Sequence, residues 1–115
     1  MPVTLAPLFE PTQIANATTT YYTATNPTQI DKMTLVNSDN AAAHWASIYL
    51  VPSGGAAGAA NRILLGNLPG KLLQPGESFD VTNAMGHILN PGDFIAAIAD
   101  TAAKVTFFAS GRVVS

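Results

Sequence analysis

Hydrophobic and polar positions alternate over short segments of this chain, and turn residues separate the segments. In 29–37, for example, Met33 and Leu35 fall on one face of an extended segment, while Lys32 and Thr34 fall on the other. Many of the segments are rich in β-branched and aromatic residues, which is typical of strands. Eight prolines interrupt most stretches that would be long enough for a helix. The pattern therefore predicts an all-β protein.

Eight strands are expected, at the spacing typical of a β-sandwich or a closed barrel. They span 19–25, 29–37, 44–51, 61–68, 71–73, 77–81, 94–99 and 104–114. The segment 44–51 is apolar on both faces, so we expect it at a central position of a sheet, and 94–99 is a nearly continuous apolar strand. We predict one antiparallel β-sandwich or jelly-roll domain over residues 19–115.

The segment 1–18 precedes this predicted domain and begins with a proline-rich stretch. We interpret it as an extended N-terminal arm rather than a regular element. The apolar residues Val3, Leu5, Leu8 and Phe9 are spaced along it. Such an arm could lie across a neighbouring subunit, add a strand to its sheet, or pack on its own subunit. We favour the intersubunit role and treat these four residues as candidates for partner binding.

Two short motifs repeat the order Pro-Gly-acid followed by an aromatic residue, in 74–79 and 90–94. Proline fixes φ at the second position of a type II turn, and glycine supplies the positive φ at the third. We predict two type II turns that lead into strands, and no ligand site at either.

The low content of charged residues limits the classes of function that the chain could have. Only 10% of the residues are charged, although 48% are hydrophobic, and the net charge is −2. A sparsely charged surface suits a protein that packs against partners in a symmetric assembly. The few basic residues are scattered, which argues against nucleic-acid binding. There is no cysteine, and we expect neither a signal peptide nor a membrane-spanning segment.

Candidate chemistry is sparse. The two histidines, His44 and His87, are not at a spacing that suits zinc, and no Gly-x-Ser-x-Gly motif marks a nucleophile. The acids Glu77, Asp80, Asp93 and Asp100 all border predicted turns; a pair of them could meet in space, as in glycosidases, but turn positions are the simpler interpretation. We expect no enzymatic activity, no metal and no cofactor.

The aromatic residues suggest an alternative function, which is sugar binding. Tyr21, Tyr22, Trp45 and Tyr49 could line a face that stacks on sugars. The interpretation we favour places Trp45 and Tyr49 in the core or at a subunit interface, as anchors of an oligomer.

Several segments together resemble the small β-sandwich virion proteins of tailed bacteriophages, including capsid cement (decoration) proteins and head-fibre or tail-associated domains. They are the segments 22–24, 30–37, 48–55, 61–64, 73–77 and 89–93. The resemblance implies a jelly-roll-like subunit that forms a homodimer or homotrimer and binds the major capsid protein or another virion protein. It also implies a location on the capsid surface after synthesis in the cytoplasm of the host bacterium. We therefore expect a capsid cement protein without nucleic-acid or membrane partners; the alternative is a head-fibre, collar or tail module that binds host glycans.

Overall fold

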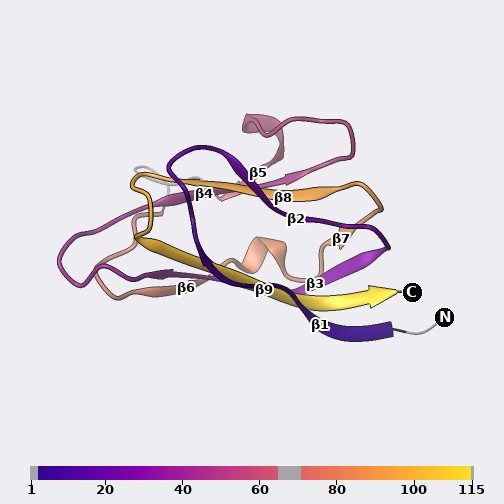
Figure 1. The fold of residues 1–115 in the computed structure, drawn as a ribbon, viewed down its shortest axis with the longest axis horizontal. Coiled ribbons are helices and arrows are strands. Elements are labelled where there is room, and N and C mark those ends of the chain that lie inside the picture. The colour runs from indigo at the N-terminus through magenta and orange to yellow at the C-terminus, as the bar shows by residue number, and fades with distance from the viewer. Residues whose placement is uncertain (1–2, 65–70, 115) are drawn as a thin grey trace.

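The computed structural model describes residues 3–64 and 71–114 of the chain. They form nine β-strands in two antiparallel sheets that face each other, so the prediction of an all-β sandwich is confirmed (Figure 1). The strands are β1 (Val3–Gln13), β2 (Thr19–Thr23), β3 (Thr28–Asn37), β4 (Ala46–Val51), β5 (Arg62–Leu64), β6 (Ser78–Asp80), β7 (Ile88–Leu89), β8 (Phe94–Ala99) and β9 (Val105–Val114). Two short 3-10 helices, η1 (Ala59–Asn61) and η2 (Thr82–Ala84), complete the described elements.

The first sheet has the strand order β1-β9-β3-β6, with β7 also paired to β3, and the second sheet has the order β2-β8-β4-β5. β4 is therefore an internal strand, as its apolar character on both faces predicted, and β8 is the other internal strand of this sheet. Within β4, Ile48 and Leu50 point into the core, whereas Tyr49 lies on the opposite face of the strand.

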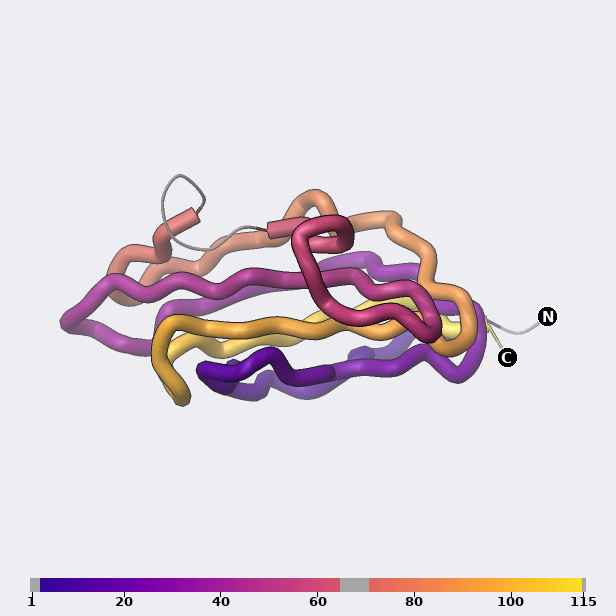
Figure 2. The backbone as a smooth tube through the Cα atoms, turned by 90° about the horizontal axis from the view of Figure 1, so that it is seen from above, coloured from indigo at the N-terminus to yellow at the C-terminus, as the bar shows by residue number. Residues whose placement is uncertain are grey.

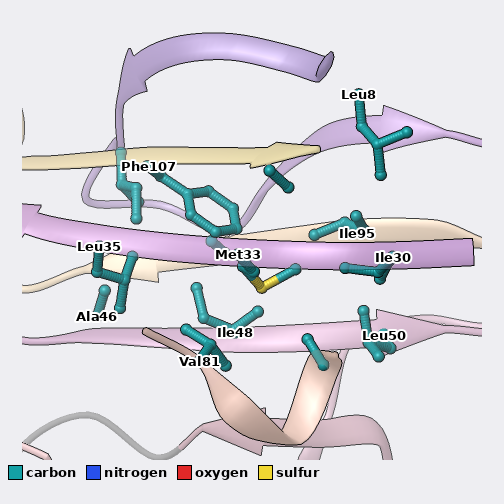
Figure 3. Close-up of a cluster of buried hydrophobic side chains, with 14 of the residues drawn as sticks. Leu8, Ile30, Met33, Leu35, Ala46, Ile48, Leu50, Val81, Ile95 and Phe107 are labelled. Carbon is teal, nitrogen blue, oxygen red and sulfur yellow. The ribbon is translucent and has the colours of Figure 1, made fainter. Parts of the chain in front are cut away.

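The core fills the space between the two sheets. Met33 of β3 and Phe107 of β9 meet Ile48 of β4 and Ile95 of β8 there, and all four are fully buried (Figure 3). The alternation of apolar and polar side chains along β3 explains this arrangement, because Met33 and Leu35 point inward while Lys32 points to solvent. Burial of such side chains contributes roughly 1.5–3 kcal/mol each relative to exposure to water.

The N-terminal segment is extended, as expected, but it is a strand of the molecule's own first sheet rather than an arm outside it. β1 pairs antiparallel with β9 over most of its length, from the pair Val3 and Val114 to the pair Gln13 and Thr106. It is an edge strand, the position at which a sheet tolerates proline. The two prolines of β1 therefore did not prevent strand formation, and the described fold includes residues 3–18.

The molecule is elongated along its strands, with extents of 47 × 26 × 20 Å (Figure 2). Because Val3 pairs with Val114, the start of β1 and the end of β9 lie at the same end, which we call the terminal end. The connection between β8 and β9 lies at the opposite end, which we call the turn end (Figure 1).

Both Pro-Gly-acid motifs form the predicted turns. Gly76 has φ +73 and Gly92 has φ +93, and the backbone N–H of each acid donates to the carbonyl three residues earlier, at 3.0 Å for Glu77 and 2.9 Å for Asp93. Each acid also accepts a hydrogen bond from the backbone N–H of the residue before the proline. The acids thus close their own turns, which explains why the motif contains them.

Two predicted segments, 61–68 and 71–73, differ most from the strands that the structure describes. Of the predicted strand 61–68, residues 62–64 form β5, and 65–68 lie outside the described residues. The predicted strand 71–73 is replaced by an isolated bridge between Leu73 and His44. β7 was not predicted, because two residues are too few to show an alternating pattern.

Candidate interaction surface

Exposed apolar side chains gather on the outer face of the first sheet, at the terminal end. Val3, Leu5 and Ile88 are 56%, 73% and 51% exposed, and they are three of the four large hydrophobic residues that are exposed in the described part of the chain. Val3 is paired with Val114, so these two valines lie side by side on the same face. We call Val3, Leu5, Ile88 and Val114 the terminal patch.

Strand pairing brings this patch together from three distant parts of the sequence. Leu5 of β1 is paired with Arg112 of β9, Arg112 with Gln29 of β3, and Gln29 with Ile88 of β7. Residues paired in this way share a face, and the following residue, Leu89, points into the core. Ile88 therefore points outward on the same face as Leu5, with Arg112 and Gln29 between them, and it lines the same depression as Val3 and Val114.

A shallow depression of about 210 Å³ lies within the terminal patch. Its lining residues are Val3, Pro27, Thr28, Gln29, Ile88, Arg112 and Val114. The guanidinium Nε of Arg112 donates to the Asp31 carboxylate at 3.1 Å, so a charged side chain, paired with Asp31, lies between Leu5 and Ile88. Arginine is enriched among the residues of protein–protein interfaces, so its presence beside exposed apolar side chains is compatible with such a surface.

The four candidate contact residues of the N-terminal segment divide into two pairs. Val3 and Leu5 belong to the exposed terminal patch. Leu8 is only 8% exposed and belongs to the hydrophobic core. The ring of Phe9 packs against Phe107, with 4.9 Å between the ring centroids, so Phe9 supports the core from the edge. Leu8 and Phe9 are thus occupied within their own subunit.

Trp45 and Tyr49 lie apart from the terminal patch. Tyr49 is on the outer face of the second sheet, since its neighbours Ile48 and Leu50 point inward. Trp45 directly precedes β4, and its carbonyl accepts a hydrogen bond from the backbone N–H of Asp100, at the turn end. Both side chains are half-buried and are not part of the core cluster. The six predicted contact residues therefore do not form one surface.

The four aromatic residues considered for sugar binding do not share a face. Tyr21 packs edge-on against Phe107, with 5.8 Å between the ring centroids, and its hydroxyl accepts a hydrogen bond from the Ala15 N–H. Tyr22 also packs against the core. Both tyrosines therefore point to the inner side of the second sheet, whereas Tyr49 points to its outer side.

The candidate acids are spread over the molecule and hold structural contacts. Glu77 forms an ion pair with Lys71 at 2.6 Å, which is the main reason why its pKa is lowered. Asp80 accepts a hydrogen bond from the Thr34 hydroxyl. Asp93 also accepts a hydrogen bond from the Ser53 N–H, in addition to closing its turn. Residues 3–64 and 71–114 contain no group of three or more ligating side chains suited to a metal ion.

The two histidines are in different surroundings. His44 is buried at the turn end, with Nε2 at 2.9 Å from the Asp39 carboxylate and Nδ1 at 3.1 Å from that of Asp100. His87 is exposed on the side of a second hollow, of about 350 Å³, between β5 and β7. Arg62 and Asp93 also line this hollow. The two histidines do not meet, so they do not form a common site.

Comparison of the chain with protein-family models, with curated proteins and with solved structures found no match. Within the described residues, no helix has the length and apolar character needed to cross a membrane.

Proposed function

We propose that this chain is a non-enzymatic structural subunit that attaches to a larger assembly through the terminal patch. The observation that carries the proposal is the gathering of Val3, Leu5 and Ile88 on one face at the terminal end, whereas most other large hydrophobic side chains of the described residues are buried or half-buried. Singly exposed hydrophobic residues are common on protein surfaces, whereas a larger exposed apolar patch is typical of an interaction site; here Val3 and Ile88 line a depression and Leu5 lies on the same face.

The assembly that we propose is the head of a tailed bacteriophage, with the chain as a capsid cement protein. The resemblance to small β-sandwich virion proteins supports this proposal, as do the low content of charged residues and the edge position of β1. The subunit would lie on the capsid surface and stabilise the shell by bridging neighbouring capsid proteins.

Several copies acting together suit this role. Covering one exposed side chain such as Leu5 contributes roughly 1–2 kcal/mol, and association itself costs several kcal/mol. A single patch of this size would therefore bind weakly, whereas a homodimer or homotrimer presents two or three patches at once and gains from multivalency. We propose the homo-oligomer on this ground, with Trp45 and Tyr49, on other parts of the surface, as its contact residues.

The absence of enzymatic activity is part of the proposal. Its support is the use of Glu77, Asp93 and Asp100 in turn closure and ion pairs, which leaves these carboxylates engaged in the folded state. A head-fibre, collar or tail module that binds host glycans is the second candidate. The inward position of Tyr21 and Tyr22 removes half of the sugar-binding face expected for it, which makes it the weaker candidate.

The test is the attachment of variants to phage particles that lack the chain. Leu5→Glu combined with Ile88→Glu places two charges in the terminal patch. Ser78→Glu is the matched control, because Ser78 is exposed on the same outer face beside Val36, near the other end of β3. We expect the double variant to occupy particles at least tenfold less than the wild type, and the control to bind normally. Equal occupancy of all three proteins, each shown to be folded by circular dichroism, would contradict attachment through the patch.

A further inference from the structure

His44 joins three chain segments at the turn end. Its backbone exchanges two hydrogen bonds with Leu73, of 3.0 Å and 2.8 Å. Its ring lies between the carboxylate of Asp39, in the connection from β3 to β4, and that of Asp100, directly after β8. The ring thereby ties the two connections of this end to each other. The ring is also largely shielded from water, since the side chain of His44 is only 9% exposed.

The geometry requires a protonated ring. Both ring nitrogens face carboxylate oxygens, at 2.9 Å and 3.1 Å, and an ionised carboxylate can only accept a hydrogen bond. A neutral imidazole donates from one nitrogen and presents a lone pair at the other. Loss of the proton would therefore leave one nitrogen lone pair facing carboxylate lone pairs in a site with little water. Only the imidazolium form satisfies both contacts.

The charged groups around the site agree with this assignment. The pKa of His44 is raised, mainly by the hydrogen bond to Asp39 and further by Asp100, against the opposing effect of burial. The pKa of Asp39 is lowered, mainly by its hydrogen bond with His44 and to a lesser extent by the charge of Lys104. On the segment that contains Leu73, Lys71 and Glu77 form an ion pair of their own.

We infer that His44 is a pH-operated latch, which holds the turn end closed while its ring is protonated and releases the Asp39 loop when the ring loses its proton. Because the pKa of a protonated partner is raised in the folded state, its stabilising effect is complete below the ordinary value of 6.5 and is lost as the pH rises through the folded value. The latch is therefore closed while the ring is protonated and the two carboxylates are ionised, and it opens as the pH rises through the raised pKa of His44. This inference is independent of the proposed attachment to a capsid.

Two backbone amides report directly on the Asp39 loop. The Ala41 N–H donates to the Asp39 side chain at 2.8 Å, and the Gly76 N–H donates to the Asp39 carbonyl at 3.2 Å. Both bonds are made to Asp39, whose other carboxylate oxygen is the one that contacts Nε2 of His44. The amide of Ile48, in the central strand β4, serves as the reference for the intact core.

The experiment is hydrogen exchange between pH 6 and pH 9, with each rate corrected for the intrinsic pH dependence of exchange. In the wild type we expect the protection of Ala41 and Gly76 to fall at least tenfold over this range, while Ile48 stays protected. His44→Gln cannot gain a proton in this range, so it should show low, pH-independent protection at the two amides. His87→Gln, at the other histidine, should behave as the wild type.

Asp39→Asn provides a second variant should His44→Gln fail to fold. It removes the largest stabilising contact of the protonated ring, so opening should occur at a lower pH than in the wild type. Unchanged protection in the wild type from pH 6 to pH 9, or loss of the pH response in His87→Gln, would overturn the inference.

Discussion

Truncation of two leucines in the same strand should have very different effects on stability. Leu5 and Leu8 are both in β1, but Leu5 is 73% exposed and Leu8 is 8% exposed. Leu8→Ala removes a side chain from the core cluster and leaves a cavity, for which buried leucines typically lose about 2–5 kcal/mol of unfolding free energy. We expect about 2–4 kcal/mol, since β1 lies at the edge of its sheet.

Leu5→Ala should cost much less. Full burial of a leucine side chain stabilises a protein by roughly 1.5–3 kcal/mol, and Leu5 has only about a quarter of its surface buried, which bounds the loss at about 0.8 kcal/mol. The two variants make the same chemical change in the same strand, so each is the control for the other.

Urea unfolding, followed by the fluorescence of the single tryptophan, Trp45, measures both effects. A loss of about 2 kcal/mol or more for Leu8→Ala, with less than about 1 kcal/mol for Leu5→Ala, would agree with β1 as an integral strand. Equal, small losses would refute the pairing of β1 with β9 in solution and would restore the free arm. Deletion of residues 1–12 should likewise destabilise the whole fold, because it removes Leu8 and Phe9 from their contacts with the core.

Three further predictions concern the backbone and acid pH. Gly111→Ala should destabilise the protein by about 1–3 kcal/mol in a urea titration, because the new methyl group would collide with the carbonyl oxygen of Gln29. Gly58→Ala is the control, since Gly58 has open space around it and should show no such loss. Gly92→Ala should lower the thermal midpoint, since its φ of +93 disfavours any side chain; an unchanged midpoint would argue against the type II turn. The pKa values of Asp39 and Glu77 are lowered in the folded protein, so the ionised carboxylates stabilise it above the ordinary carboxyl pKa. This stabilisation is lost as the pH falls through their pKa values in the folded state, and the urea midpoint should therefore fall from pH 5 to pH 3. A midpoint that stays constant over that range would count against these ion pairs.

Most of the fold could be predicted from the sequence, because each long strand carries its own alternation. The expected segments 29–37, 94–99 and 104–114 agree with β3, β8 and β9 to within one residue at each end. Both Pro-Gly turns were predicted for the same reason, since the chemistry of a tight turn is local. β1 was missed as a strand because proline is excluded from internal strands but not from edges, and edge position is a property of the whole sheet.

The candidate surface could be predicted only in part. Val3 and Leu5 were identified by their apolar character. Leu8 and Phe9 lie where the pairing of β1 with β9 is irregular, with register shifts between Pro7 and Phe9 and again after Phe9. These shifts change which side chains of β1 point inward, and the sequence alone does not reveal them. Ile88 and Val114 join the patch only through the register of β7, β3 and β9, which depends on contacts far apart in the chain.

The central claim is that the chain is a structural subunit attached in many copies to a phage head. Quantitative mass spectrometry of purified virions, with the copy number of this chain measured against that of the major capsid protein, tests it most directly. We predict a copy number of the same order as that of the capsid protein. A handful of copies would instead indicate a fibre, collar or tail position, and complete absence from the particles would contradict the claim.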